Sequence, residues 1–184
     1  MIDLNRYLDT YKTFISDDVV ITQLNQLGEL LEDVKRSGGR LMLFGNGAAA
    51  SIASHAALDF TKQGKLTSMC FHDSALLTAF SNDFGYENVY KEAIKHYYQN
   101  GDVCIFLSVS GESPNIVSAA TYCKSQDIPV ISFSGRHKHN ALSKLSKMSF
   151  WVDSDAYNIV ENTHSIWLLS MVDYLIGTEI YEVS

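Results

Sequence analysis

Apolar residues follow two different patterns along this chain, and the patterns alternate over most of its length. Short, nearly uninterrupted apolar runs are typical of strands buried on both faces of a parallel sheet, whereas spacings of three and four residues are typical of helices. The runs predict strands at 41–44, 68–71, 103–107, 129–133 and 148–152. The spacings predict helices at 48–60, 74–80, 87–99, 115–125, 140–145 and 159–176. This alternation predicts an α/β fold with an open, doubly wound parallel sheet flanked by helices.

The first 37 residues contain no strand pattern and predict two further helices. Apolar residues recur at helical spacing from Ile2 to Ile15 and again from Val20 to Val34. They cover more than a narrow stripe of each helix, which favours packing on the core and on a second subunit. Because no repeat or linker divides the chain, we expect residues 1–184 to form one domain that begins with these helices.

Two polar turns follow predicted strands and mark a candidate ligand site. Gly45-Asn46-Gly47 follows the strand at 41–44, and Ser108 to Pro114 follows the strand at 103–107. Ligands of open α/β sheets bind beyond the carboxyl ends of the strands, at the point where the strand order reverses. Each turn also opens a helix, whose N-terminus offers free N–H groups and a positive dipole end to an anion. The two turns together predict a site for a sugar or a phosphate.

Three hydroxyl groups in the second turn, from Ser108, Ser110 and Ser113, suit a phosphate dianion without any lysine. The alternative is that these serines only cap the helix and form the turn. The first turn is neither a dinucleotide fingerprint, because Ala50 stands where the third glycine belongs, nor a Walker loop. Gly45 and Gly47 are equally compatible with a role only in forming the turn, without any contact to a ligand.

The net charge bears on the class of partner, and the cysteine content bears on the cellular compartment. The net charge of −7 and the absence of a basic run argue against nucleic acid as the main partner. Cys70, Cys104 and Cys123 are odd in number and form no CxxC motif, which favours buried free thiols in a reducing cytosol. The first residues do not resemble a signal peptide, and no apolar run reaches the length of a membrane span. We therefore expect a cytoplasmic protein that does not contact a membrane.

The order of these motifs resembles the sugar isomerase (SIS) domain over nearly the whole chain. The turn Gly45-Asn46-Gly47 is followed by Asn82-Asp83-Phe84-Gly85, by the SxSGxS turn, and by a last helix with Glu161 and His164. Within that family the sequence most resembles the phosphoheptose isomerases, which interconvert sedoheptulose 7-phosphate and a heptose 7-phosphate. The resemblance implies a flavodoxin-like three-layer sandwich with an N-terminal helical segment. It also implies a homo-oligomer, a tetramer or a dimer, with sites at subunit boundaries.

The resemblance also implies the residues that contact the substrate. In that family the hydroxyls of the serine turn hold the phosphate, and the glycine turn and the Asn-Asp pair contact the sugar. Asn82 and Asp83 fall in a stretch, 80–86, that we predict to be a polar, aromatic loop. For His164, a structural role is an open alternative. The implied contacts are Asn46, Gly47, Asn82, Asp83, Ser108, Ser110, Ser113 and His164.

The catalytic positions of the family are altered in this chain. The family has a His and, four residues later, a Glu on the helix after the glycine turn, and both bind zinc in several members. These positions are His55 and Asp59 here, on one side of a helix, a spacing that suits a metal or an acid beside a base. On the last helix, Glu161 and Leu169 stand where the family has Gln and a catalytic, zinc-binding His.

These residues predict a rearranged acid/base pair. Glu161 with Asp59 or His55 could move a proton between C1 and C2 of a sugar through an enediol. The same three side chains are the candidate zinc ligands, and no other cofactor is implied. The plain alternatives are that His55 is a hydrogen-bonded core histidine and that Glu161 is only a charge near the start of a helix.

Two functions remain open from the sequence. The first is an aldose–ketose isomerase that acts on a sugar phosphate, which the acidic residues at both catalytic positions favour. The second is a non-catalytic SIS module that binds phosphosugars or proteins. The second is favoured by the loss of the family His at Leu169, and by Ala48-Ala49 where the family has Gly-Ser. We predict an enzyme.

Overall fold

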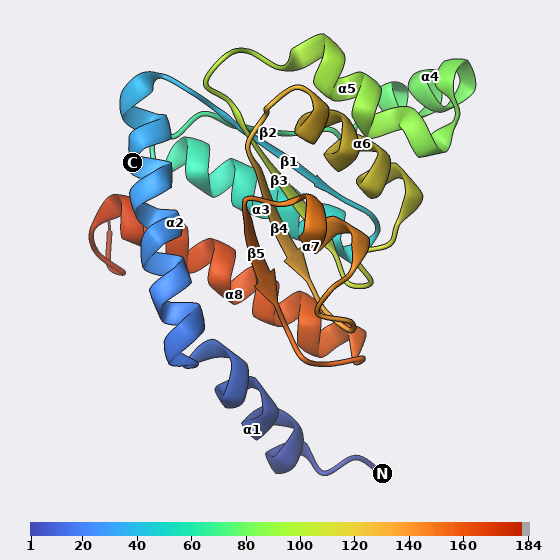
Figure 1. Cartoon of the computed structure of the whole chain (residues 1–184). Helices are drawn as coiled ribbons and strands as arrows, with labels where there is room; N and C mark the ends of the chain where they lie inside the picture. Colours follow the sequence, from blue (N-terminus) through green and yellow to red (C-terminus); the bar gives the residue numbers. More distant parts are fainter. Residues whose placement is uncertain (182–184) are drawn as a thin grey trace.

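A computed structural model describes residues 1–181 and has three layers, with helices on both faces of one sheet (Figure 1). The five strands are all parallel and lie in the order β2-β1-β3-β4-β5, which confirms the predicted α/β fold. The strands are β1 (Leu41–Gly45), β2 (Ser68–Cys70), β3 (Val103–Ser108), β4 (Val130–Ser134) and β5 (Met148–Trp151). In this order the direction of winding reverses between β1 and β3, which is therefore the switch point.

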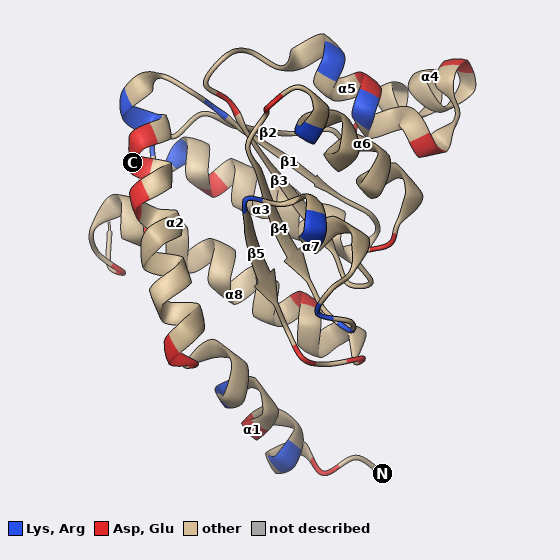
Figure 2. Cartoon of the chain, in the orientation of Figure 1, with Lys and Arg blue, Asp and Glu red and all other residues tan. Residues whose placement is uncertain are grey.

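The helices of the core lie on two sides of this sheet. One side carries α2 (Asp18–Ser37), α3 (Ala48–Lys62) and α8 (Tyr157–Ile176), and the other carries α5 (Val89–Tyr97), α6 (Pro114–Ser125) and α7 (Ala141–Leu145). The remaining helices are α1 (Leu4–Ile15), α4 (Ser74–Phe84) and the short 3₁₀ helix η1 (Tyr86–Asn88). Figure 2 shows Lys and Arg on many separate elements, interspersed with Asp and Glu.

The apolar runs of the strands are explained by burial on both faces. In β1, Leu41 and Leu43 pack into the core beneath α2, α3 and α8, while Met42 and Phe44 pack into the core beneath α5 and α6. Successive side chains of a strand point to opposite faces, so a strand between two layers of helices needs an apolar residue at every position.

The first helix lies largely outside the core. Figure 1 shows α1 extending beyond the sheet, and none of its residues is buried. Tyr7, Tyr11 and Phe14 pack against the core from one side of α1, and the Asn162 side chain of α8 donates a hydrogen bond to the Tyr11 hydroxyl (2.9 Å). Leu4 and Leu8 remain exposed in this single chain.

The predicted loop at 80–86 is wrong, because α4 continues to Phe84 and carries Asn82 and Asp83 in its last turn. The Asp73 carboxylate caps the helix by accepting from the N–H groups of Ala75 (2.9 Å) and Leu76 (3.1 Å). No glycine or proline interrupts the following residues, and the helix ends only at Gly85, whose φ of +80° suits glycine.

The predicted free thiols are confirmed. Cys104 and Cys123 are buried and Cys70 is partly buried, and all three are free. Among residues 1–181, no helix combines the length and the apolar character that crossing a membrane requires.

Candidate functional site

A cavity of about 110 Å³ lies at the carboxyl ends of β1 and β3. Both turns singled out by the sequence contribute to its wall, with Asn46 and Ala49 from one side and Ser108, Ser110 and Ser113 from the other. Because this position is the switch point of the sheet, the cavity stands where an open α/β sheet binds its ligands.

The serine turn is organised by its own hydrogen bonds. The N–H of Gly111 donates to the Ser108 hydroxyl (3.2 Å), and the N–H of Glu112 donates to the Ser110 hydroxyl (3.1 Å). The Ser108 and Ser113 hydroxyl oxygens lie 3.2 Å apart, and the Ser113 side chain makes no capping bond to α6. Pro114 has no N–H, and the N–H of Ile116 donates to the Asn115 amide oxygen (3.0 Å), so the N-terminus of α6 favours an anion mainly through the helix dipole.

α7 holds the serine turn in place from behind. The buried Asn140 side chain donates to the Ser134 hydroxyl (3.0 Å) and to the His137 carbonyl oxygen (2.8 Å). The Glu112 carboxylate accepts from the N–H of Ala141 (2.8 Å). Gly111 has a φ of +65°, and a Cβ there would lie 2.1 Å from the Asn140 amide oxygen. Only glycine fits this contact without a shift of Asn140.

We expect Gly111→Ala to lower the free energy of unfolding by about 2 to 3 kcal/mol, because it combines backbone strain with a steric clash against a buried side chain. The matched control is Gly177→Ala, which also has a positive φ (+84°), but no atom of residues 1–181 lies within 4 Å of the added Cβ. This control should cost only about 1 kcal/mol. Urea unfolding of both variants measures the difference, and equal losses would contradict the proposed contact.

The glycine turn is fixed by a pair of amides. Asn46 and Asn115 donate to each other's side-chain oxygen, both at 2.9 Å, and Asn115 is only 1% exposed. The Tyr86 hydroxyl donates to the same Asn46 oxygen (3.0 Å), and the buried Tyr90 hydroxyl donates to the Gly45 carbonyl oxygen. The glycine turn after β1 is thus hydrogen-bonded to the first turn of α6, which follows β3.

Sequence reasoning missed Asn115, Tyr86, Tyr90 and Tyr157. Asn115 stands directly after the serine turn, and this adjacency was the available signal for it. Tyr157 lines the cavity from the first turn of α8. Nothing in the local sequence distinguishes these three tyrosines from tyrosines that pack in a core.

Glu161 lies in the cavity wall together with the serines, one turn after Tyr157. Partial burial raises the pKa of its carboxyl above the ordinary value. A carboxylate with a raised pKa binds a proton more readily, which suits a group that removes a proton from a carbon and returns it.

His55 and Asp59 are in side-chain contact on α3, with 3.1 Å between Nε2 and Oδ2. The His55 side chain is 57% exposed, so the alternative of a core histidine is wrong. Burial raises the pKa of Asp173, and the nearby carboxylates of Glu179 and Asp59 raise it further. Asp59 therefore lies beside the last turns of α8, about 18 Å along that helix from Glu161 at 1.5 Å per residue.

This separation bears on the candidate zinc ligands. Within residues 1–181, no three His, Cys, Asp or Glu side chains lie close enough together to hold a metal ion. His55 and Asp59 are adjacent, but Glu161 is in the cavity wall at the other end of α8. The three candidate ligands therefore do not form a zinc site within the part of one chain that the structure describes.

Four other candidates, Asn82, Asp83, His164 and Gly47, lie outside the cavity wall. Asn82 and Asp83 are exposed on α4, where the Asn82 amide donates to the Asp83 carboxylate (2.9 Å). His164 is 1% exposed and its Nε2 donates to the Ser134 carbonyl oxygen (3.1 Å), with Phe133 and Trp167 against its ring. Gly47 precedes α3 with a φ of +57°.

Burial lowers the pKa of His164 to about 4, despite its hydrogen bond to Ser134. In an unfolded chain the pKa of histidine is about 6.5, so the unfolded state binds more protons between these two pH values. The free energy of unfolding should therefore fall as the pH falls from about 6.5 to 4, by about 1.4 kcal/mol per pH unit from this group. Urea unfolding at a series of pH values measures this decrease. The free energy of unfolding should decrease less between about pH 6.5 and 4 in His164→Gln than in the wild type, and equal decreases would contradict the prediction.

Comparison with known proteins identifies the family. The sequence profile of the SIS domain matches residues 8–135. The phosphoheptose isomerase of Serratia proteamaculans is 32% identical over 139 residues, covering 73% of this chain and 72% of the relative. The phosphoheptose isomerase of Akkermansia muciniphila is 28% identical over 179 residues, covering 94% of this chain and 92% of the relative.

Two solved structures share the fold. Phosphoheptose isomerase GmhA from Neisseria gonorrhoeae superposes with a TM-score of 0.85 at 22% identity, covering 95% of this chain and 97% of that one. The Vibrio vulnificus NanR protein, complexed with ManNAc-6P, superposes with a TM-score of 0.70 at 15% identity, covering 95% and 62%. This chain therefore belongs to the SIS domain family and is phosphoheptose isomerase-like within it.

Proposed function

We propose that this protein is an isomerase that interconverts an aldose phosphate and a ketose phosphate, of the sedoheptulose 7-phosphate type. The observation that carries the proposal is one cavity that combines three serine hydroxyls, a helix N-terminus and the half-buried carboxylate of Glu161. The names of the relatives support the same reaction class.

The phosphate of the substrate would lie against Ser108, Ser110 and Ser113. These hydroxyls and the N-terminus of α6 supply hydrogen bonds and partial positive charge without a lysine. At about 110 Å³, the cavity accepts the phosphate end, and the sugar would extend past Asn46 and Tyr157.

The reaction needs one base and no external oxidant. Glu161 would take a proton from C1 of the open-chain ketose, and the C–H electron pair forms the enediolate as the C2 carbonyl electrons move to oxygen. Glu161 would then return the proton to C2 while the hydroxyl proton moves from O1 to O2, which leaves the aldose. A carboxylate whose pKa is raised by burial suits both directions of this transfer.

The proposal includes a homo-oligomer. Within one chain, His55 and Asp59 lie too far from Glu161 to share a site with it. Both side chains are accessible on α3. In a dimer or tetramer with sites at subunit boundaries, this pair would contribute to the site of a second copy. The exposed apolar residues of α1 supply a surface for such contacts.

A second candidate function is phosphosugar binding without catalysis. The cavity wall has Ala49 where the resemblance predicts a serine, and Leu169 offers no base or ligand. A fold shared with NanR, which was solved with ManNAc-6P, agrees with such a role.

The test is deuterium exchange in deuterated water, followed by NMR over a panel of sugar phosphates that includes sedoheptulose 7-phosphate. Isomerisation through an enediol places deuterium at C1 or C2, even where the net equilibrium changes little. Calorimetric titration of the same sugars measures binding separately. Binding without exchange for every sugar would overturn the enzyme and support the second candidate.

We expect Ser113→Ala to weaken the binding of sugar phosphates about 10- to 100-fold, since a hydrogen bond to a charged group contributes about 1.5 to 3 kcal/mol. Calorimetric titration checks this directly. Ser125→Ala, at the opposite end of α6, is the matched control and should bind as the wild type does. Equal affinities in the two variants would contradict the phosphate site.

A further inference from the structure

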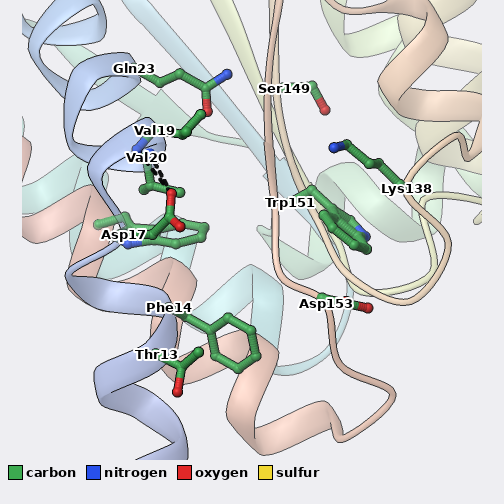
Figure 3. A pocket seen from close by; sticks show the side chains of 11 residues that line it. Thr13, Phe14, Asp17, Val19, Val20, Gln23, Lys138, Ser149, Trp151 and Asp153 are labelled. Carbon is green, nitrogen blue, oxygen red and sulfur yellow. Dashed lines mark hydrogen bonds between the residues drawn. The ribbon is translucent and has the colours of Figure 1, made fainter.

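A second and larger cavity, of about 430 Å³, opens where α1 and α2 meet the free edge of the sheet at β5. Figure 3 shows Phe14, Asp17 and Gln23 on the helix side of it, and Lys138, Trp151 and Asp153 on the other. Its volume is in the range of small-molecule sites, and its wall combines aromatic surface with a few polar groups, as such sites do.

Both tryptophans of the chain, Trp151 and Trp167, belong to this wall. Trp167 is 1% exposed, and its indole N–H has no hydrogen-bond partner among residues 1–181. The Lys138 ammonium lies 5.4 Å from the centre of the Trp151 ring. Because a buried donor without a partner costs free energy, an acceptor oxygen supplied by a ligand would be favourable here.

The polar groups of the wall include both donors and acceptors. Asp17 uses one carboxylate oxygen to cap α2, accepting from the N–H groups of Val19 (3.0 Å) and Val20 (3.1 Å). Its second oxygen and the exposed Asp153 carboxylate are acceptors, while Lys138 and the Gln23 amide donate. Two carboxylates against one ammonium disfavour an anion, and so many polar groups disfavour a purely apolar ligand.

We propose that this cavity binds an uncharged carbohydrate, at a site separate from the serine cavity. A hydroxyl group is both donor and acceptor, so an array of hydroxyls matches a wall of carboxylates, an amide and an ammonium. The C–H faces of a sugar ring suit the flat, apolar surface of an aromatic side chain. This inference does not rest on the proposed isomerase function.

The test is a titration of the full-length protein with unphosphorylated mono- and disaccharides, followed by tryptophan fluorescence. Since both tryptophans lie in the wall, we expect a saturable change in emission with at least one sugar. In Gln23→Ala the change should be lost or should require a much higher sugar concentration. It should be retained in the control Gln26→Ala, since Gln26 is exposed one turn further along α2. It should also persist in Ser113→Ala and in saturating inorganic phosphate.

Three outcomes would overturn the proposal. The first is no saturable change with any sugar, and the second is an equal response in Gln23→Ala and Gln26→Ala. The third is dissociation of an oligomer by Gln23→Ala, measured by sedimentation, with no sugar bound by the wild type. That result would assign the cavity to an interface between copies of the chain.

Discussion

Replacing Glu161 with Gln should slow the exchange of deuterium into a bound sugar phosphate by about 10²- to 10⁴-fold, the usual contribution of a general base. The substitution keeps the size of the side chain and removes only its ability to hold a proton. Sugar phosphate binding, which we assign to the serine turn, should change much less. NMR of the exchange and calorimetric titration measure the two effects separately.

The pH dependence supplies an independent check on the same residue. The base must be ionised to act, so the wild-type exchange rate should fall as the pH falls through the raised pKa of Glu161. Asp59→Asn is the comparison variant, because Asp59 lies outside the cavity wall of its own chain and would act only in the site of a second copy. If Asp59→Asn abolishes exchange and Glu161→Gln does not, then the base is Asp59 from a second copy and our assignment of Glu161 is wrong.

Replacing Arg40 with Met should lower the free energy of unfolding by about 3 to 5 kcal/mol, because it leaves a buried carboxylate without its cation. The Asp102 side chain is 2% exposed and joins the start of β1 to the start of β3. Arg40 donates to it through Nε (3.0 Å) and Nη2 (2.6 Å), and the N–H of Gln99 donates to it as well (2.9 Å).

The matched control is Arg36→Met, which breaks an exposed pair with Asp33 and should cost about 0 to 1 kcal/mol. Urea unfolding measures both variants. Adding Asp102→Asn to Arg40→Met should restore part of the loss, because the unpaired charge is then removed as well. Similar losses in the two single variants would show that the buried ion pair has no special role.

The strands and the two site turns were predictable because their signals are local. The apolar run before Gly45 and the one before Ser108 identify strands buried on both faces, and the glycines and serines that follow identify turns. Parallel strands align their carboxyl ends, so the fold class predicts Asn46 and Ser113 at the same edge of the sheet. They line one cavity because β1 and β3 are neighbouring strands.

The helix around Asn82 and the role of His164 were not predictable in this way. The composition of 80–86 is that of a polar loop, but the helix that Asp73 caps continues to Phe84 and ends at Gly85, which has a positive φ. His164 is adjacent in sequence to plausible catalytic residues, yet its place on α8 directs it into the core against Phe133.

The sequence by itself determined that this chain folds as a SIS domain and where its serine turn stands, because periodicity, glycine turns and a helix N-terminus are short-range properties. Only the tertiary structure decided which acidic residue reaches that turn. Glu161 and Asp59 are equally plausible as bases in sequence. The packing of α3 against α8 places Glu161 at the cavity and Asp59 about 18 Å along α8. That choice depends on how two helices lie across each other, which no local pattern specifies.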